Sequence, residues 1–270
     1  MMDTSEGDSA PAKATTQWPE VRQIGLADII EVLAAGLRDF RAAPLYSLSF
    51  GAIYAVGGWV LVLLLLYFDL PYLVYPLAMG FALIAPFIAT GLYAISHSLE
   101  ANQPPTWNVL LGSVRRATGS DLGWMALVTG FSLFIWIDIA GIIFLGFFGF
   151  SSLNVPDLLA QIFTTPIGLV FLLVGNAVGA VLALIVFSFS VVSFPMLFDR
   201  NVDFVTAMVT SVKVVLENPH SMIVWCGIIA VLIAGSLLSA LVGLFIVLPV
   251  LGHATWHLYR RAVGPAPGAA

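Results

Sequence analysis

Long apolar stretches alternate along the chain with short segments in which polar and charged residues gather. A stretch of about 20 mostly apolar residues can cross a bilayer, and only a helix satisfies its backbone hydrogen bonds there. The pattern therefore predicts an all-α, polytopic membrane protein with six transmembrane helices. We place these spans near residues 45–68, 73–96, 122–147, 167–193, 221–238 and 240–258.

The last two stretches leave little room for a turn between them. From His220 to Arg260 there are about 40 residues for two crossings at about 1.5 Å per residue. Gly235, Ser236 and Ser239 are suited to a tight turn. Two full spans and a re-entrant hairpin that never fully emerges are both compatible with this spacing.

Amphipathic segments precede the pairs of spans. In residues 26–40, 107–116 and 204–216, apolar residues recur at the spacing of one helical face, which is typical of short helices on a membrane surface. Each segment is followed by a polar break and a helical hairpin. The order indicates a threefold hairpin repeat around a central interface, or an ordinary bundle of hairpins with no internal repeat.

The two ends of the chain differ from the apolar middle. Residues 1–21 are acidic and rich in small residues, and residues 264–270 consist of Gly, Pro and Ala. Such compositions cannot bury enough apolar surface to fold, so both are expected to be disordered tails. Residues 22–263 are expected to form the membrane domain.

Composition and charge add an orientation. The chain is 60% hydrophobic and only 9% charged, which is typical of membrane proteins rather than soluble domains. All ten Lys and Arg residues fall on one side of the predicted spans, and the opposite loops carry none. Because positive charge is retained on the cytoplasmic side, we expect a multi-pass protein of the inner (plasma) membrane with both termini in the cytoplasm. The basic residues are Lys13, Arg22, Arg38, Arg41, Arg115, Arg116, Arg200, Lys213, Arg260 and Arg261.

Particular stretches of the sequence resemble a known family. They are residues 91–99 (GLYAISHSL), 193–200 (SFPMLFDR) and 248–260 (LPVLGHATWHLYR). Together they are similar to the bacterial integral membrane family called domain of unknown function 2189, and the likeness covers roughly residues 22–263. The resemblance implies a six-span bacterial inner-membrane protein for which the family has no established activity.

Two histidines near the end of the last span are candidate metal ligands. His253 and His257 are four residues apart and project from one helical face, so they could share a metal such as Zn²⁺. Ligands from elsewhere would complete the site, and His97 could face His253 across a haem. Alternatively, both histidines bond backbone carbonyls or lipid phosphates at the interface. We expect no cofactor.

Asp138 is the one acidic residue well inside a predicted span. A charge at that depth is costly, so a functional role is the default hypothesis. Asn176 lies at a similar depth in the following span, where the two side chains could be level. A proton or cation relay and a purely structural polar pair are the alternatives.

Catalytic and nucleotide-binding motifs are missing from the sequence. It contains no P-loop, GxSxG, carboxylate cluster or CxxC, and its scattered basic residues do not indicate nucleic-acid binding. We therefore expect a non-enzymatic protein that contacts the lipid bilayer and binds, or helps to assemble, other membrane components. The alternative functions are transport of a small solute or ion, and binding of a metal or haem.

Overall fold

The computed structural model describes residues 19–67, 87–117, 121–149 and 155–265. Within these ranges the chain is helical, and its isolated β-bridge joins Val21 to Val263. The prediction of an all-α fold is confirmed. One helix covers residues 87–100. The others are α1 (Leu26–Ala42), α2 (Pro44–Tyr67), α4 (Trp107–Ala117), α5 (Asp121–Phe148), α6 (Val155–Thr164), α7 (Pro166–Ser190), α8 (Ser193–Asp199), α9 (Phe204–Glu217), α10 (Pro219–Leu238) and α11 (Leu244–Ala262).

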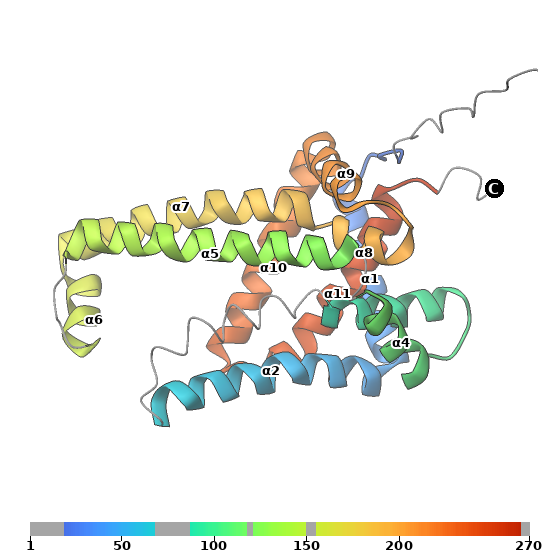
Figure 1. The fold of residues 1–270 in the computed structure, drawn as a ribbon, viewed down its shortest axis with the longest axis horizontal. Helices are drawn as coiled ribbons and strands as arrows, with labels where there is room; N and C mark the ends of the chain where they lie inside the picture. Colours follow the sequence, from blue (N-terminus) through green and yellow to red (C-terminus); the bar gives the residue numbers. More distant parts are fainter. Residues whose placement is uncertain (1–18, 68–86, 118–120, 150–154, 266–270) are drawn as a thin grey trace, which may run out of the picture.

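Most of the short helices gather at one end of the molecule, and the long helices α2, α5 and α7 extend away from it (Figure 1). We call this the short-helix end, and define it by α1, α4, α8, α9 and the last turns of α11. The Lys and Arg residues that the structure describes lie on these helices or directly beside them. The fold therefore segregates the cations as the sequence predicted, although which side of a membrane they face stays a prediction.

Four helices of the described ranges are long and apolar enough to cross a membrane: Pro44–Leu64, Asp121–Phe148, Pro166–Asp199 and Pro219–Leu238. They coincide with four of the expected spans. The expected span 73–96 falls largely on residues outside the described ranges, and α11, expected as the sixth, is not among the four. Several membrane-spanning helices are thus present, whereas the number six and the threefold repeat stay predictions.

Local sequence signals explain where several helices begin. Asp28 accepts a 2.8 Å hydrogen bond from the Gly25 N–H at the start of α1, and Asp203 accepts a 2.9 Å bond from the Thr206 N–H at the start of α9. These acidic side chains satisfy or complement the free N–H groups of a first turn. Proline occupies the first helical position of α2, α7 and α10, where its missing N–H costs nothing.

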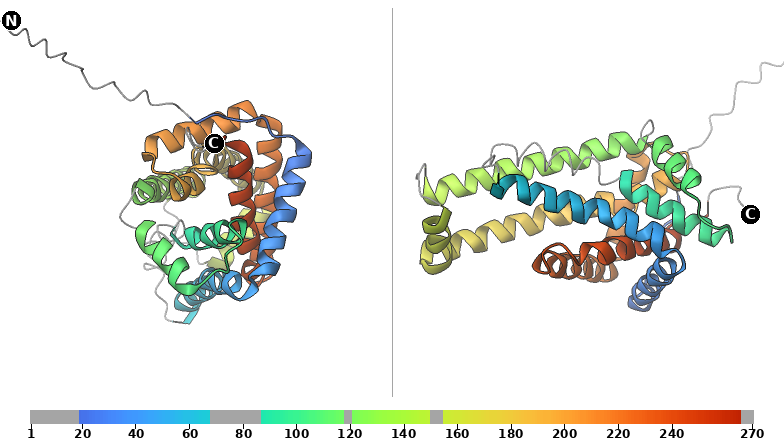
Figure 2. Two further views of the ribbon diagram at one scale, coloured as in Figure 1. Left: turned by 90° about the vertical axis from the view of Figure 1, so that its right-hand side faces the viewer. Right: turned by 90° about the horizontal axis from the view of Figure 1, so that it is seen from below.

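Helix α11 is the centre of the short-helix end. It packs along α1 and α2, and Figure 2 shows α1 lying beside it. Gly36 permits the α1 contact, because a Cβ atom there would lie 2.7 Å from the backbone oxygen of Val250. Trp256 and Tyr259 of α11 are fully buried in the largest hydrophobic cluster. By contrast, little of α5 or α7 is covered by protein within the described residues.

One helix was not predicted. The segment between the third and fourth expected spans contains α6, which lies across the far ends of α5 and α7 (Figure 1). It is amphipathic, with Asp157 in its first turn and a largely exposed Phe163. Because its ten residues carry a weak signal between two strongly apolar stretches, the sequence alone suggested only a loop.

Candidate functional site

His253 is completely buried where α11 meets α2 and the helix of residues 87–100. Its Nε2 lies 2.9 Å from the Ser47 hydroxyl, and its Nδ1 lies 2.8 Å from the Ser96 hydroxyl. A neutral imidazole can therefore make hydrogen bonds through both of its ring nitrogens here. This satisfies a polar side chain that would otherwise be costly to bury.

The hydrogen bonds around His253 favour one tautomer of its imidazole. The Ser47 hydroxyl donates a 2.9 Å hydrogen bond to the carbonyl oxygen of Ala43. Ser47 therefore accepts from Nε2–H of His253, and Ser96 donates to Nδ1.

A chain of charged groups continues from Asp39 along the short-helix end. The Asp39 carboxylate lies 2.7 Å from Nε2 of His257, and Nδ1 of His257 lies 3.7 Å from Glu100. Glu100 in turn lies 3.4 Å from Arg260. These contacts tie α1 and the helix of residues 87–100 to the last turns of α11.

Tyr259 joins this chain to α8. Its hydroxyl donates a 2.5 Å hydrogen bond to Asp199 and accepts a 2.6 Å bond from Nε of Arg200. Arg200 also donates to the carbonyl oxygen of Gly264 at 2.5 Å. Burial, with the hydrogen bond to Asp199, raises the pKa of Tyr259, so the phenol keeps its proton and acts as a donor.

The pKa of Asp39 reflects the same network. Burial alone would raise it, but the hydrogen bonds from His257 and Ser96 and the charge of His257 outweigh burial and hold the pKa below its usual value of 3.8. Asp39 is therefore a carboxylate at neutral pH. A partly buried carboxylate that is satisfied in this way stabilises the junction between α1 and α11.

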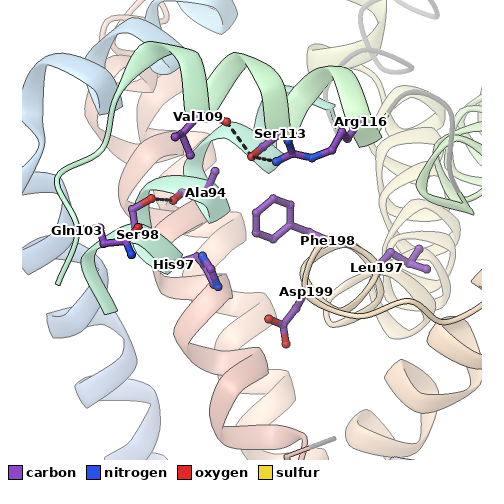
Figure 3. Close-up of a pocket in the computed structure, with 10 residues that line it drawn as sticks. All are labelled: Ala94, His97, Ser98, Gln103, Val109, Ser113, Arg116, Leu197, Phe198 and Asp199. Carbon is purple, nitrogen blue, oxygen red and sulfur yellow. Dashed lines mark hydrogen bonds between the residues drawn. The ribbon is translucent and has the colours of Figure 1, made fainter. Parts of the chain in front are cut away.

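A cavity of about 440 Å³ adjoins this network (Figure 3). Its walls come from the helix of residues 87–100, from α4 and from α8. Asp199 belongs both to the cavity wall and to the charged chain. The cavity thus brings a network of titratable side chains into contact with a space large enough for a small ligand.

The structure does not bring His253 and His257 together as free ligands. His253 contacts two serines and His257 contacts two carboxylates. Within the described ranges, no group of three or more His, Cys, Asp and Glu side chains is arranged to hold a metal ion. His97 packs edge-on against Trp256 and does not bond His253. The metal or haem hypothesis stays a prediction, which metal analysis and an absorption spectrum of the purified chain can test.

Asp138 and Asn176 both lie on exposed surface, on α5 and α7. The amide of Asn176 donates a 2.7 Å hydrogen bond to the carbonyl oxygen of Leu172, one turn earlier in its own helix. No hydrogen bond between Asp138 and Asn176 occurs among the residues described. A proton or cation relay through these two side chains stays a hypothesis, and no direct contact between them supports it.

The family model described as "Predicted integral membrane protein (DUF2189)" matches residues 74–199. The predicted resemblance to this family is confirmed over these residues. Curated proteins and solved structures gave no match. The DUF2189 segment is narrower than the expected likeness over residues 22–263, and it leaves out the motif at residues 248–260. It includes the three elements that form the cavity wall.

Several members of this network have no signal in the sequence. Asp39 and His257 are separated by 218 positions, and Ser47 and His253 by 206. Serines within apolar helices are common and often bond their own backbone.

Proposed function

We propose that this chain is a non-enzymatic, multi-pass protein of the bacterial inner membrane that binds other membrane proteins through its α5–α7 hairpin and so assists their assembly. Both termini lie in the cytoplasm in this proposal. The observation that carries it is the surface of the hairpin, which extends far from the short-helix end and is covered by little of the described protein (Figure 1).

A groove of about 420 Å³ runs between α5 and α7. Both small residues and aromatic residues line it. Its lining includes Trp136, Ala140, Phe171, Gly175, Gly179 and Ala183. In a membrane, helices associate by close packing rather than by the hydrophobic effect, and small residues allow their backbones to approach. The groove therefore suits a transmembrane helix of a partner.

The glycines of the groove permit a clean test. A Cβ added at Gly175 would meet no atom within 4 Å, and the same holds for Gly146 on α5, which does not line the groove. Gly175→Leu therefore adds a side chain to the groove at a position with space for its Cβ atom, and Gly146→Leu is the matched control.

The experiment uses the full chain in its native membranes with a photo-crosslinking residue in place of Leu172. We expect a discrete protein adduct that Gly175→Leu reduces at least several-fold and Gly146→Leu leaves unchanged. A crosslinker in place of Ile185, which is exposed on α7 outside the groove, should give no such adduct. If Leu172 yields adducts with lipid alone, the proposed function is wrong.

A further inference from the structure

The cavity at the short-helix end is lined by both polar and apolar side chains (Figure 3). One side presents side chains that can form hydrogen bonds. Opposite it, the ring of Phe198 extends into the space between α4 and the helix of residues 87–100. The polar members are His97, Ser98, Gln103, Ser113, Arg116 and Asp199. A pocket of this kind recognises a molecule with one charged group and one apolar part.

Arg116 brings a positive charge that the described protein does not neutralise. Its guanidinium donates a 3.1 Å hydrogen bond to the Ser113 hydroxyl, and no carboxylate pairs with it in the described part of the chain. The remaining N–H groups of the Arg116 guanidinium are available to a ligand. Guanidinium groups favour phosphate and carboxylate, because two parallel N–H groups match two oxygens.

His97 adds a second available donor. Its imidazole packs edge-on against Phe198 and Trp256 at ring-centroid distances of 6.3 and 5.8 Å. These contacts fix the ring, but neither nitrogen hydrogen-bonds to a described residue. His97 and Arg116 come from different helices and line the same cavity.

The acidic residue of the cavity does not offset this charge. Asp199 accepts from the Tyr259 hydroxyl at 2.5 Å and lies 3.6 Å from both Arg200 and Arg260. Its negative charge is therefore already balanced by two arginines. The uncompensated charge in the cavity is that of Arg116, and it favours an anion.

The position of the cavity relative to the apolar part of α2 further limits which class of ligand fits. Helix α4 is amphipathic, and its Trp107 contacts Tyr46 in the first turn of α2 at a centroid distance of 4.8 Å. This is where the apolar part of α2 begins, and so where lipid headgroups would meet the protein. An inorganic phosphate would fill only part of about 440 Å³ and would leave the wall of Leu197 and Phe198 uncovered.

From these observations we infer that the cavity binds a phosphate ester, with Arg116 and His97 contacting the phosphate and Phe198 and Leu197 contacting the organic part. The same chemistry is offered by the headgroup of an anionic phospholipid and by a soluble phosphoester. Gln103 and Ser98 stand at the wall where hydroxyl groups of a glycerol unit would find hydrogen-bond partners.

The test uses the full chain purified in mild detergent, with phosphatidylglycerol and glycerol 1-phosphate as separate probes. Native mass spectrometry measures retention of the lipid, and calorimetry measures binding of the soluble ester. Arg116→Gln removes the charge, and Arg115→Gln is the matched control, because Arg115 is exposed next to it and does not line the cavity. His97→Gln is an independent second variant.

We expect Arg116→Gln and His97→Gln each to weaken binding, by about tenfold or more for the arginine, whereas Arg115→Gln binds as the unaltered chain does. Dependence on Arg116 with the lipid identifies a headgroup site, and the same dependence with glycerol 1-phosphate alone identifies a soluble ester. If Arg115→Gln and Arg116→Gln weaken binding equally, general surface charge explains the effect and the inference is overturned. Failure of both probes to bind would overturn it too. Thermal unfolding of each variant separates loss of binding from loss of fold.

Discussion

The indole N–H of Trp59 donates a 2.7 Å hydrogen bond to the carbonyl oxygen of Ala240. Ala240 lies in the turn between α10 and α11, where it and Leu241 have positive φ angles of 52° and 70°. A Cβ atom added at Gly58 would lie 2.8 Å from Cδ1 of Leu241, so the two residues are close neighbours. The tip of the α10–α11 hairpin is therefore level with residue 59 of α2, although α2 continues to Tyr67.

Because the α10–α11 turn lies beside residue 59 of α2, we predict that the tip of this hairpin stays within the membrane. Beyond Trp59, the apolar part of α2 extends to Leu64 and the helix to Tyr67, which is about 7 to 12 Å further at about 1.5 Å per residue. In a chain with Cys226→Ala, we expect Ser239→Cys to resist a membrane-impermeant maleimide. Rapid labelling of Ser239→Cys in sealed vesicles would instead establish two full spans.

Removal of the Trp59 N–H donor should lower the stability of the chain, because the Ala240 carbonyl at the hairpin tip would lose its partner inside the membrane. In hydrocarbon, an unpaired carbonyl has no water to bond. We expect Trp59→Phe to lower the free energy of unfolding in detergent by about 1–3 kcal/mol. Trp124→Phe is the control, because Trp124 is 60% exposed on α5 and its stacking on Phe204 survives the change. Equal effects of the two substitutions would show that the hydrogen bond contributes nothing.

Close packing of α1 on α11 gives a prediction about Gly36. In Gly36→Ala, the new methyl group would lie 2.7 Å from the backbone nitrogen of Ala254 and from the oxygen of Val250, and backbone atoms cannot rotate away. We expect a loss of about 1–3 kcal/mol in the free energy of unfolding, despite the higher helix propensity of alanine. Gly146→Ala meets no atom within 4 Å and should cause no loss.

Much of the helical pattern could be predicted from the sequence, but the buried faces of the helices could not. The apolar spacing located α1 correctly, yet Leu26 and Ile30 of the expected face are 53% and 70% exposed, whereas Val32 is fully buried. The described protein covers only part of the apolar face of α1, so the hydrophobic period located the helix but not the residues that it buries.

The candidate site was harder to predict for a different reason. The spacing of His253 and His257 correctly placed them on one helix, but their partners come from distant segments. Ser47, Ser96 and Asp39 are polar residues in helices with no local feature that marks them. Such partners are determined by tertiary packing, which a single sequence does not reveal.

The lowered pKa of Asp39 predicts a specific dependence of stability on pH. A carboxyl group whose pKa is lower in the folded chain adds stability above its unfolded pKa, and that stability is lost as pH falls through the folded value. The unaltered chain should therefore be more stable than Asp39→Asn near pH 6, and the difference should shrink as pH falls below 3.8. Thermal unfolding of both proteins across this range measures it. A difference that is constant with pH would exclude the Asp39 carboxylate as its cause.

We expect the chain to cross the bilayer with the short-helix end on one side and α6 on the other. In the Cys226→Ala background, Ala34→Cys on α1 and Ala160→Cys on α6 place one exposed thiol at each end. A membrane-impermeant maleimide is then applied to right-side-out and to inside-out vesicles of the bacterial inner membrane. We predict that Ala160→Cys reacts only in right-side-out vesicles and Ala34→Cys only in inside-out ones. Reaction of both thiols in the same vesicles would contradict this topology.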